Sequence, residues 1–74
     1  MTAMVERYIE LNAFIKLKGV AATSGRAKLS IRSGKVLVNG VVETRNRKKL
    51  VAGDKVSVEG KEFIVEEKVC LKVK

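Results

Sequence analysis

The stretch Thr23–Gly40, TSGRAKLSIRSGKVLVNG, decides how this chain folds. Thr23 or Ser24 can cap the start of a helix, because a hydroxyl oxygen accepts a hydrogen bond from the N–H groups that the first turn leaves unpaired. Gly34 marks the expected end of this helix, since glycine takes up the left-handed conformation at little steric cost. The stretch therefore predicts a short helix that stops sharply.

Apolar residues in the same stretch indicate a buried helix face and a hairpin. Ala27 and Ile31 are four residues apart, so they lie on one face of a helix and can point into a core. Val36–Val38 is then expected to be a strand, and Asn39-Gly40 is a strong two-residue hairpin signal. Val41–Glu43 becomes the returning strand.

The segment before Thr23 predicts a first helix. Leu11, Phe14 and Ile15 have the i, i+3, i+4 spacing of a buried helical stripe, and Gly19 is a suitable stop. Tyr8–Leu11 can be either a short strand or the entry to this helix, and residues 1–6 show no strong pattern. Two short helices joined by a few residues are expected to pack as a pair.

The segment after the hairpin predicts a loop and more strands. Thr44–Lys49, TRNRKK, is too charged to be buried and is expected to be an exposed loop. Valines alternate in Lys55–Glu59 after a turn at Gly53-Asp54, and a second turn is expected at Gly60-Lys61. Apolar residues alternate again at Phe63 and Val65, in the strand expected after this turn. They also alternate at Val69, Leu71 and Val73, and this last stretch predicts an edge strand.

These elements predict an α+β fold. We expect one small domain over residues 1–74, with its core at about 9–65, in which two short N-terminal helices pack on a small, curved, mostly antiparallel sheet. A single cysteine cannot form an internal disulfide, and no apolar run approaches the roughly 18 residues of a membrane span. The expected protein is a soluble, cytoplasmic monomer.

The positive charge of the chain is concentrated in one segment. The 74 residues carry a net charge of +8. Ten basic residues and one acid, Glu43, lie between Lys16 and Lys49, which leaves this segment at +9 and the remainder at −1. A polyanionic partner is the simplest reason for such a block, since each neutralised phosphate releases counterions. A merely solubilising surface is the alternative that charge leaves open.

Catalysis has little support in the sequence. The chain has no histidine, and its one cysteine, Cys70, has only lysines and glutamates nearby. Glu66 and Glu67 are adjacent, so on a strand they point to opposite faces and cannot act as a pair. No glycine-rich phosphate loop or metal-ligand spacing is present. We therefore expect no enzyme, no cofactor, no metal and no small-molecule substrate.

The order of these motifs resembles the S4-type RNA-binding domain, also called the alpha-L motif. The resemblance covers roughly Ile9 to Val65, and it is closest to the small stand-alone bacterial branch, the YbcJ/YaaA-like proteins. The matching residues are the helix cap, the helix face, the hairpin and the later turn: Thr23, Ala27, Ile31, Gly34, Val36, Val38, Asn39, Gly40, Leu50, Gly53, Asp54 and Val56.

The resemblance implies a non-catalytic protein that binds structured RNA, of the ribosomal or transfer RNA class, through the second helix and the following loop. With only three aromatic residues, recognition of the RNA backbone and shape is favoured over base stacking. An acidic partner protein or double-stranded DNA remains an alternative. The candidate RNA-binding residues are Arg26, Lys28, Arg32, Lys35, Arg45, Arg47, Lys48 and Lys49.

Overall fold

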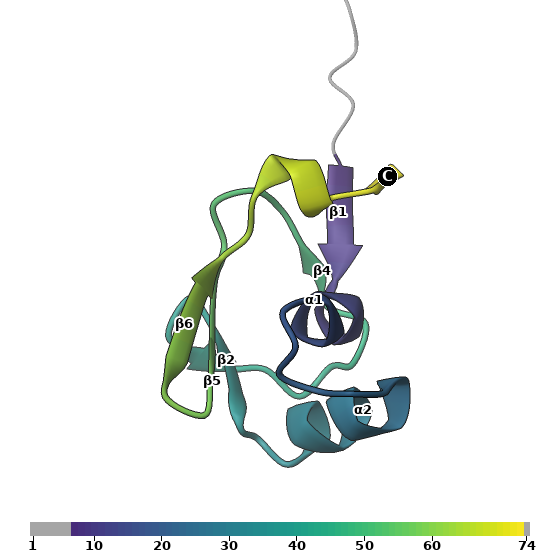
Figure 1. The fold of residues 1–74 in the computed structure, drawn as a ribbon. Coiled ribbons are helices and arrows are strands. Elements are labelled where there is room, and N and C mark those ends of the chain that lie inside the picture. The colour runs from purple at the N-terminus through teal and green to yellow at the C-terminus, as the bar shows by residue number, and fades with distance from the viewer. Residues whose placement is uncertain (1–6, 74) are drawn as a thin grey trace, which may run out of the picture.

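The computed structural model describes residues 7–73, so the expectation for residues 1–6 lies outside the described part of the chain. Its helices are α1 (Leu11–Leu17) and α2 (Ser24–Arg32), and a 3₁₀ turn, η1, covers Glu67–Val69 (Figure 1). The predicted α+β class is confirmed. The strands are β1 (Arg7–Glu10), β2 (Val36–Val38), β3 (Val41–Val42), β4 (Lys49–Leu50), β5 (Lys55–Val58), β6 (Lys61–Ile64) and β7 (Lys72–Val73).

α2 begins and ends where its local signals predict. The Thr23 side-chain oxygen accepts a hydrogen bond from the Arg26 N–H at 3.2 Å. At the other end Gly34 has a φ of +78°, and its N–H donates to the Ile31 carbonyl at 3.2 Å. This left-handed residue satisfies a carbonyl that the last turn leaves open and directs the chain into β2. The predicted cap and stop are both confirmed.

The strands form two antiparallel sheets rather than one. The larger has the order β3-β2-β5-β6, and the smaller has the order β4-β1-β7. β1 runs directly into α1, so its partners are the strands that pass the start of that helix. Ile9 of β1 pairs with Leu50 of β4, and Tyr8 of β1 pairs with Lys72 of β7. In Figure 1, β1 and β4 lie above α1, whereas β2, β5 and β6 lie beside it.

Two turns of the same kind join strands within the larger sheet. Asn39 and Gly40 have φ values of +52° and +81°, which confirms the predicted hairpin. Glu59 and Gly60 repeat the pattern at +50° and +79° between β5 and β6. The second turn therefore lies one residue earlier than the predicted Gly60-Lys61, because both of its central residues adopt positive φ.

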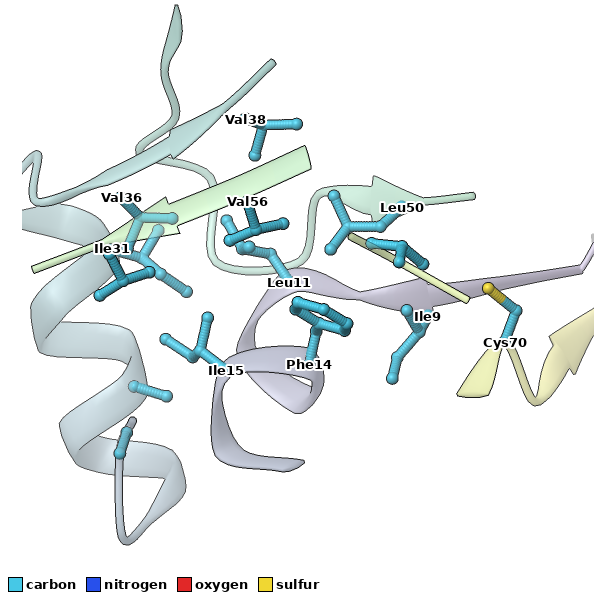
Figure 2. Close-up of a cluster of buried hydrophobic side chains, with 14 residues drawn as sticks. Ile9, Leu11, Phe14, Ile15, Ile31, Val36, Val38, Leu50, Val56 and Cys70 are labelled. Carbon is cyan, nitrogen blue, oxygen red and sulfur yellow. The ribbon is translucent and has the colours of Figure 1, made fainter. Parts of the chain in front are cut away.

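The core lies between α1, α2 and the two sheets (Figure 2). Leu11, Phe14 and Ile15 are fully buried, as predicted, and the Phe14 ring meets Phe63 edge-on with centroids 6.4 Å apart. Deleting a buried Phe costs about 3–5 kcal/mol, a large share of a small domain's stability. The packing of Leu11, Phe14 and Ile15 holds α1 against the core, and α2 is held in place because it packs against α1. The other buried apolar residues are Ile9, Ala21, Ala27, Ile31, Val36, Val38, Leu50, Val56, Val58, Val65 and Cys70.

The C-terminal segment differs from the prediction. The alternation from Val69 to Val73 predicts a strand, but η1 occupies its start and only the two residues of β7 pair with β1. The N–H of Cys70 bonds back to the Glu67 carbonyl at 3.0 Å, and this turn buries Cys70 while leaving Leu71 82% exposed. The predicted last edge strand is therefore confirmed only in part: β7 lies at the edge of the smaller sheet, but it is short, because hydrogen bonds within a tight turn replace strand pairing over the start of the segment.

Candidate nucleic-acid interface

Exposed cations lie on α2 and just beyond its C-terminal end. Arg26, Lys28 and Arg32 on the helix, and Lys35 just beyond it, are all exposed. Among residues 7–73, no carboxylate lies within 4.0 Å of any of these charged groups. Lys28 and Arg32 are one turn apart, and two like charges at that spacing destabilise a helix slightly unless an anion lies between them. We call these four residues the α2 cationic surface.

The N-terminal end of α2 gathers further positive charge. Arg26 is the third residue of the helix, and the first turn contains no acid that would offset the partial positive charge of the helix N-terminus. Lys16 of α1 reaches this end, where its Nζ donates to the Ser24 hydroxyl at 3.2 Å. Sequence reasoning did not include Lys16 among the candidates. Its position outside the buried stripe of α1 is the signal that could have found it.

In the loop Thr44–Lys48, both arginines form ion pairs with carboxylates of the same chain. Arg45 Nε lies 2.9 Å from a carboxylate oxygen of Glu43, and Arg47 Nε lies 3.0 Å from one of Glu10. Sequence reasoning recognised Glu43 as the nearby acid but missed Glu10, which is 37 residues from Arg47. β1 brings Glu10 there by pairing with β4. The loop therefore presents two arginines that already bind carboxylates.

These contacts set the ionisation of both acids. Burial alone would raise the pKa of Glu10, but hydrogen bonds and positive charge from Arg47 and Lys72 outweigh it and hold that pKa below its ordinary value. The side-chain hydrogen bond from Arg45 likewise lowers the pKa of Glu43, and Glu43 in turn raises the pKa of Arg45. Both carboxylates are therefore charged at neutral pH and compete with any anion for these arginines.

Lys49 belongs to β4 and not to the exposed loop in which the sequence placed it. It pairs with Glu10 of β1, and its Nζ lies 5.2 Å from the centre of the Tyr8 ring. A cation over an aromatic face is attracted by the ring electrons. Tyr8 is half-buried, so its role in the described structure is to pack beneath Lys49.

Backbone hydrogen bonds at the two ends of this loop connect the C-terminal end of α2 with the N-terminal end of α1. The N–H of Glu43 donates to the Val36 carbonyl at 2.9 Å, close to where α2 ends. At its other end the loop caps α1, because the N–H groups of Leu11 and Asn12 donate to the Lys48 and Asn46 carbonyls at 2.8 and 3.1 Å. The loop thus runs from the end of α2 to the start of α1.

The predicted site residues line three separate hollows. Lys28 and Arg32 line a hollow of about 250 Å³, and Arg26 and Lys35 line another of about 460 Å³. A third hollow, of about 360 Å³, is lined by Arg45, Arg47, Lys48 and Lys49. Leu29 is the one residue that two of these hollows share, and it is 63% exposed. The structure therefore groups Arg45, Arg47, Lys48 and Lys49 together and divides the α2 cationic surface in two.

The described residues offer no constellation for catalysis. Within residues 7–73, no group of three or more His, Cys, Asp or Glu side chains could hold a metal ion. The Cys70 thiol is buried, donates to the Glu66 carbonyl at 3.5 Å, and has a pKa raised by burial and by the charges of Glu67 and Asp54. A protonated, buried thiol is a poor nucleophile. Neither helix in the described part of the chain has the length and hydrophobicity of a membrane span.

Two curated proteins are similar to this chain in sequence. YbcJ of Escherichia coli strain K12, described provisionally as an RNA-binding protein, is 45% identical over 53 residues, which cover 72% of this chain and 76% of YbcJ. RlbA of Bacillus subtilis strain 168, described provisionally as a ribosome maturation protein, is 40% identical over 52 residues, covering 70% and 73%.

A solved structure and a family model agree with these relatives. The solution structure of Escherichia coli YbcJ, described as containing an alpha-L motif involved in RNA binding, superposes with a TM-score of 0.63 at 38% identity, over 89% of this chain and 81% of that one. A family model of the S4 domain matches residues 3–66. By sequence and by fold, this chain belongs to the S4 domain family, as the motif order predicted.

Proposed function

We propose that this protein is a non-catalytic RNA-binding protein that contacts structured RNA through the α2 cationic surface and the loop cations Arg45, Arg47, Lys48 and Lys49. The observation that carries the proposal is that none of the four exposed residues of the α2 cationic surface has a carboxylate within 4.0 Å among residues 7–73, in a chain of the S4 domain family. Arginine forks and lysine ammonium groups match phosphate oxygens, and a helix N-terminus adds a partial positive charge.

Ribosomal RNA is the class we favour over transfer RNA. RlbA is described as a ribosome maturation protein, and the described part of our chain has few exposed aromatic groups that could read single-stranded bases. Backbone and shape recognition by scattered cations suits a folded RNA. Crosslinking in cells followed by sequencing of the bound RNA tests this choice directly, with ribosomal RNA as the expected enriched class.

The electrostatic part of the proposal is tested by the dependence of affinity on salt. If about four to six phosphates are neutralised, the affinity for a structured RNA should fall steeply between dilute and physiological buffer. Lys28→Ala should weaken binding and reduce the salt slope by about one unit. Lys68→Ala is the matched control, because Lys68 is an exposed lysine of η1, which lies at the opposite end of the molecule from α2 (Figure 1).

Two outcomes would contradict the proposal. An affinity that does not change with salt would refute the phosphate-contact account. Recovery of an acidic protein from crosslinked cells, with no RNA above background, would assign the cationic surface to a protein partner instead.

A further inference from the structure

The largest of the three hollows has features that phosphate binding alone does not explain. It measures about 460 Å³ and lies between the outer face of α2, the α1–α2 connection and the β5–β6 turn. This volume falls in the range of about 300–1,000 Å³ that small-ligand pockets occupy. We propose that this hollow takes one unpaired nucleotide of the bound RNA, with guanine as its preferred base. The proposal rests on the RNA-binding function above and deepens it.

Leu29 supplies the apolar contact for a base. It points away from the core on α2, is 63% exposed, and lines both this hollow and the neighbouring one at Lys28 and Arg32. Val20 and Ala21 of the α1–α2 connection line the same hollow and add apolar surface. The exposed side chain of Leu29 thus lies between two pairs of cations. It is suited to the face of a base that has been turned out of its helix.

The two cations of the hollow suit the phosphate of the same nucleotide. Arg26 and Lys35 both line it, and neither has a carboxylate within 4.0 Å among residues 7–73. Ser30 also lines the hollow, and no hydrogen bond of its hydroxyl to another described residue is found. A phosphate and a ribose would therefore meet a fork of N–H donors, an ammonium group and a hydroxyl.

Glu59 determines which base the hollow prefers. Glu59 is one of the residues that line the hollow, as is Lys35, and its carboxylate forms no ion pair with a described residue. A carboxylate repels phosphate, so its presence indicates a ligand that also donates hydrogen bonds. The Watson–Crick edge of guanine carries two adjacent N–H donors, which match the two oxygens of one carboxylate, whereas uracil offers a single donor there.

The backbone at Glu59 supports the same assignment. Glu59 has a φ of +50° in the first position of its turn, where Asn39 stands in the equivalent turn at +52°. Asn, Asp and Gly are the residues that this position favours, and other side chains are strained there. Turn formation alone would not select glutamate. Glu59 therefore adds backbone strain to the turn, and as a lining residue of the hollow it brings a hydrogen-bond acceptor to the ligand.

The experiment compares three RNAs that differ in one nucleotide. The probes are a fully paired RNA duplex, the same duplex with a single bulged guanosine, and the same duplex with a single bulged uridine. Wild-type protein should bind the guanosine bulge about tenfold more tightly than the paired duplex and several-fold more tightly than the uridine bulge, the size of one or two hydrogen-bonded contacts.

Two pairs of matched variants assign the preference to the hollow. Leu29→Ser should abolish the preference for a bulge, whereas Leu17→Ser, at a leucine that is 57% exposed on α1, should keep it. Glu59→Gln should remove the preference for guanosine over uridine. Glu67→Gln removes the same charge from another exposed glutamate and should leave that preference intact. Circular dichroism confirms that each variant is folded.

The outcomes separate this proposal from the RNA-binding function. Salt-dependent binding with equal affinity for all three duplexes would overturn the nucleotide pocket and leave the RNA-binding function standing. Loss of guanosine preference in both glutamate variants would attribute the preference to net charge and overturn the role of Glu59. Failure of the folded wild type to bind any of the three duplexes, or ribosomal RNA, would overturn both.

Discussion

Arg26 and Arg47 are both exposed arginines, but they differ in what already binds them. Arg26 has no carboxylate within 4.0 Å among residues 7–73, whereas Arg47 donates to Glu10 at 3.0 Å. If both touch one RNA, alanine at either position should weaken binding and lower the salt slope. We expect the larger loss from Arg26→Ala, because Arg47 must share its guanidinium between Glu10 and a phosphate. Affinity measured against salt concentration for both variants checks this order.

Unfolding curves serve as the control for these two arginine variants. Arg26→Ala should leave thermal stability nearly unchanged, since the side chain is exposed. Arg47→Ala removes a surface ion pair, whose contribution to stability is small. If only Arg47→Ala weakens binding, α2 is a scaffold and the site is limited to the loop. If neither does so in folded protein, the assigned surface is wrong.

Glu10 predicts a pH dependence of stability on the acid side. Burial opposes ionisation, but Arg47 and Lys72 hold its folded-state pKa below the ordinary value of 4.5. Because the folded-state pKa is the lower one, its contribution is complete above the unfolded pKa and is lost as the pH falls through the folded one. Urea unfolding should therefore show that Glu10→Gln lowers the free energy of unfolding at neutral pH and that the difference shrinks in acid. A difference that is constant with pH would contradict this account.

At the level of elements, two glycines should respond to alanine in opposite directions. Gly40 has a φ of +81° in the β2–β3 turn, and no atom of residues 7–73 lies within 4 Å of an added Cβ, so backbone strain is what opposes a side chain there. Gly40→Ala should cost about 1–2 kcal/mol, and the β-branched Gly40→Val should cost more. Gly25 lies in α2, and its added Cβ meets only Thr23 Oγ1 at 3.9 Å. Gly25→Ala should stabilise by up to about 1 kcal/mol.

Thermal unfolding measures this pair of substitutions. For a domain of this size, 1 kcal/mol corresponds to a shift of about 4–8 °C in the midpoint. An unchanged midpoint in Gly40→Val would show that the turn does not require the left-handed conformation.

The β5–β6 turn allows a stabilising substitution. Glu59 occupies a left-handed position that favours asparagine, and Asn39 fills the equivalent position of the β2–β3 turn. Asn39 also bonds to Asp54 and to the Lys55 N–H, whereas the Glu59 side chain bonds to no other described residue. Glu59→Asn should therefore raise the unfolding midpoint by a few degrees. A lower midpoint would indicate that the glutamate stabilises the free protein in a way that its contacts do not reveal.

At the level of the whole molecule, most predictions from short-range patterns were confirmed, although the β5–β6 turn lies one residue earlier than expected, whereas the division of the strands into two sheets was not predicted. The Thr23 cap, the Gly34 stop and the Asn39-Gly40 turn depend on residues within a few positions of one another, so the sequence contains the whole cause. The division into two sheets depends on β1 meeting β4 and β7, which lie far along the chain. Strands of two residues leave almost no periodic signal to detect.

The same distinction applies to the candidate interface. The concentration of cations in one segment was visible in composition, and the exposure of those on α2 follows from the buried face of Ala27 and Ile31. The pairing of Arg47 with Glu10 was not visible, because it is created by strand pairing. The assignment of RNA contacts to these residues stays a prediction. Among residues 7–73, the cations on α2 are therefore free of carboxylate partners, whereas Glu43 and Glu10 partly neutralise the arginines of the loop.

Hydrogen exchange at the start of α1 can measure the opening of the loop that caps this helix. The N–H groups of Leu11 and Asn12 donate to carbonyls of Lys48 and Asn46, at the C-terminal end of that loop. When the loop lifts, these two amides lose their acceptors, so their deuterium uptake measures how often it opens. RNA held by the loop cations should slow uptake at Leu11 and Asn12, although neither residue is placed in contact with RNA. An RNA bound by α2 alone would leave both rates as they are in the free protein.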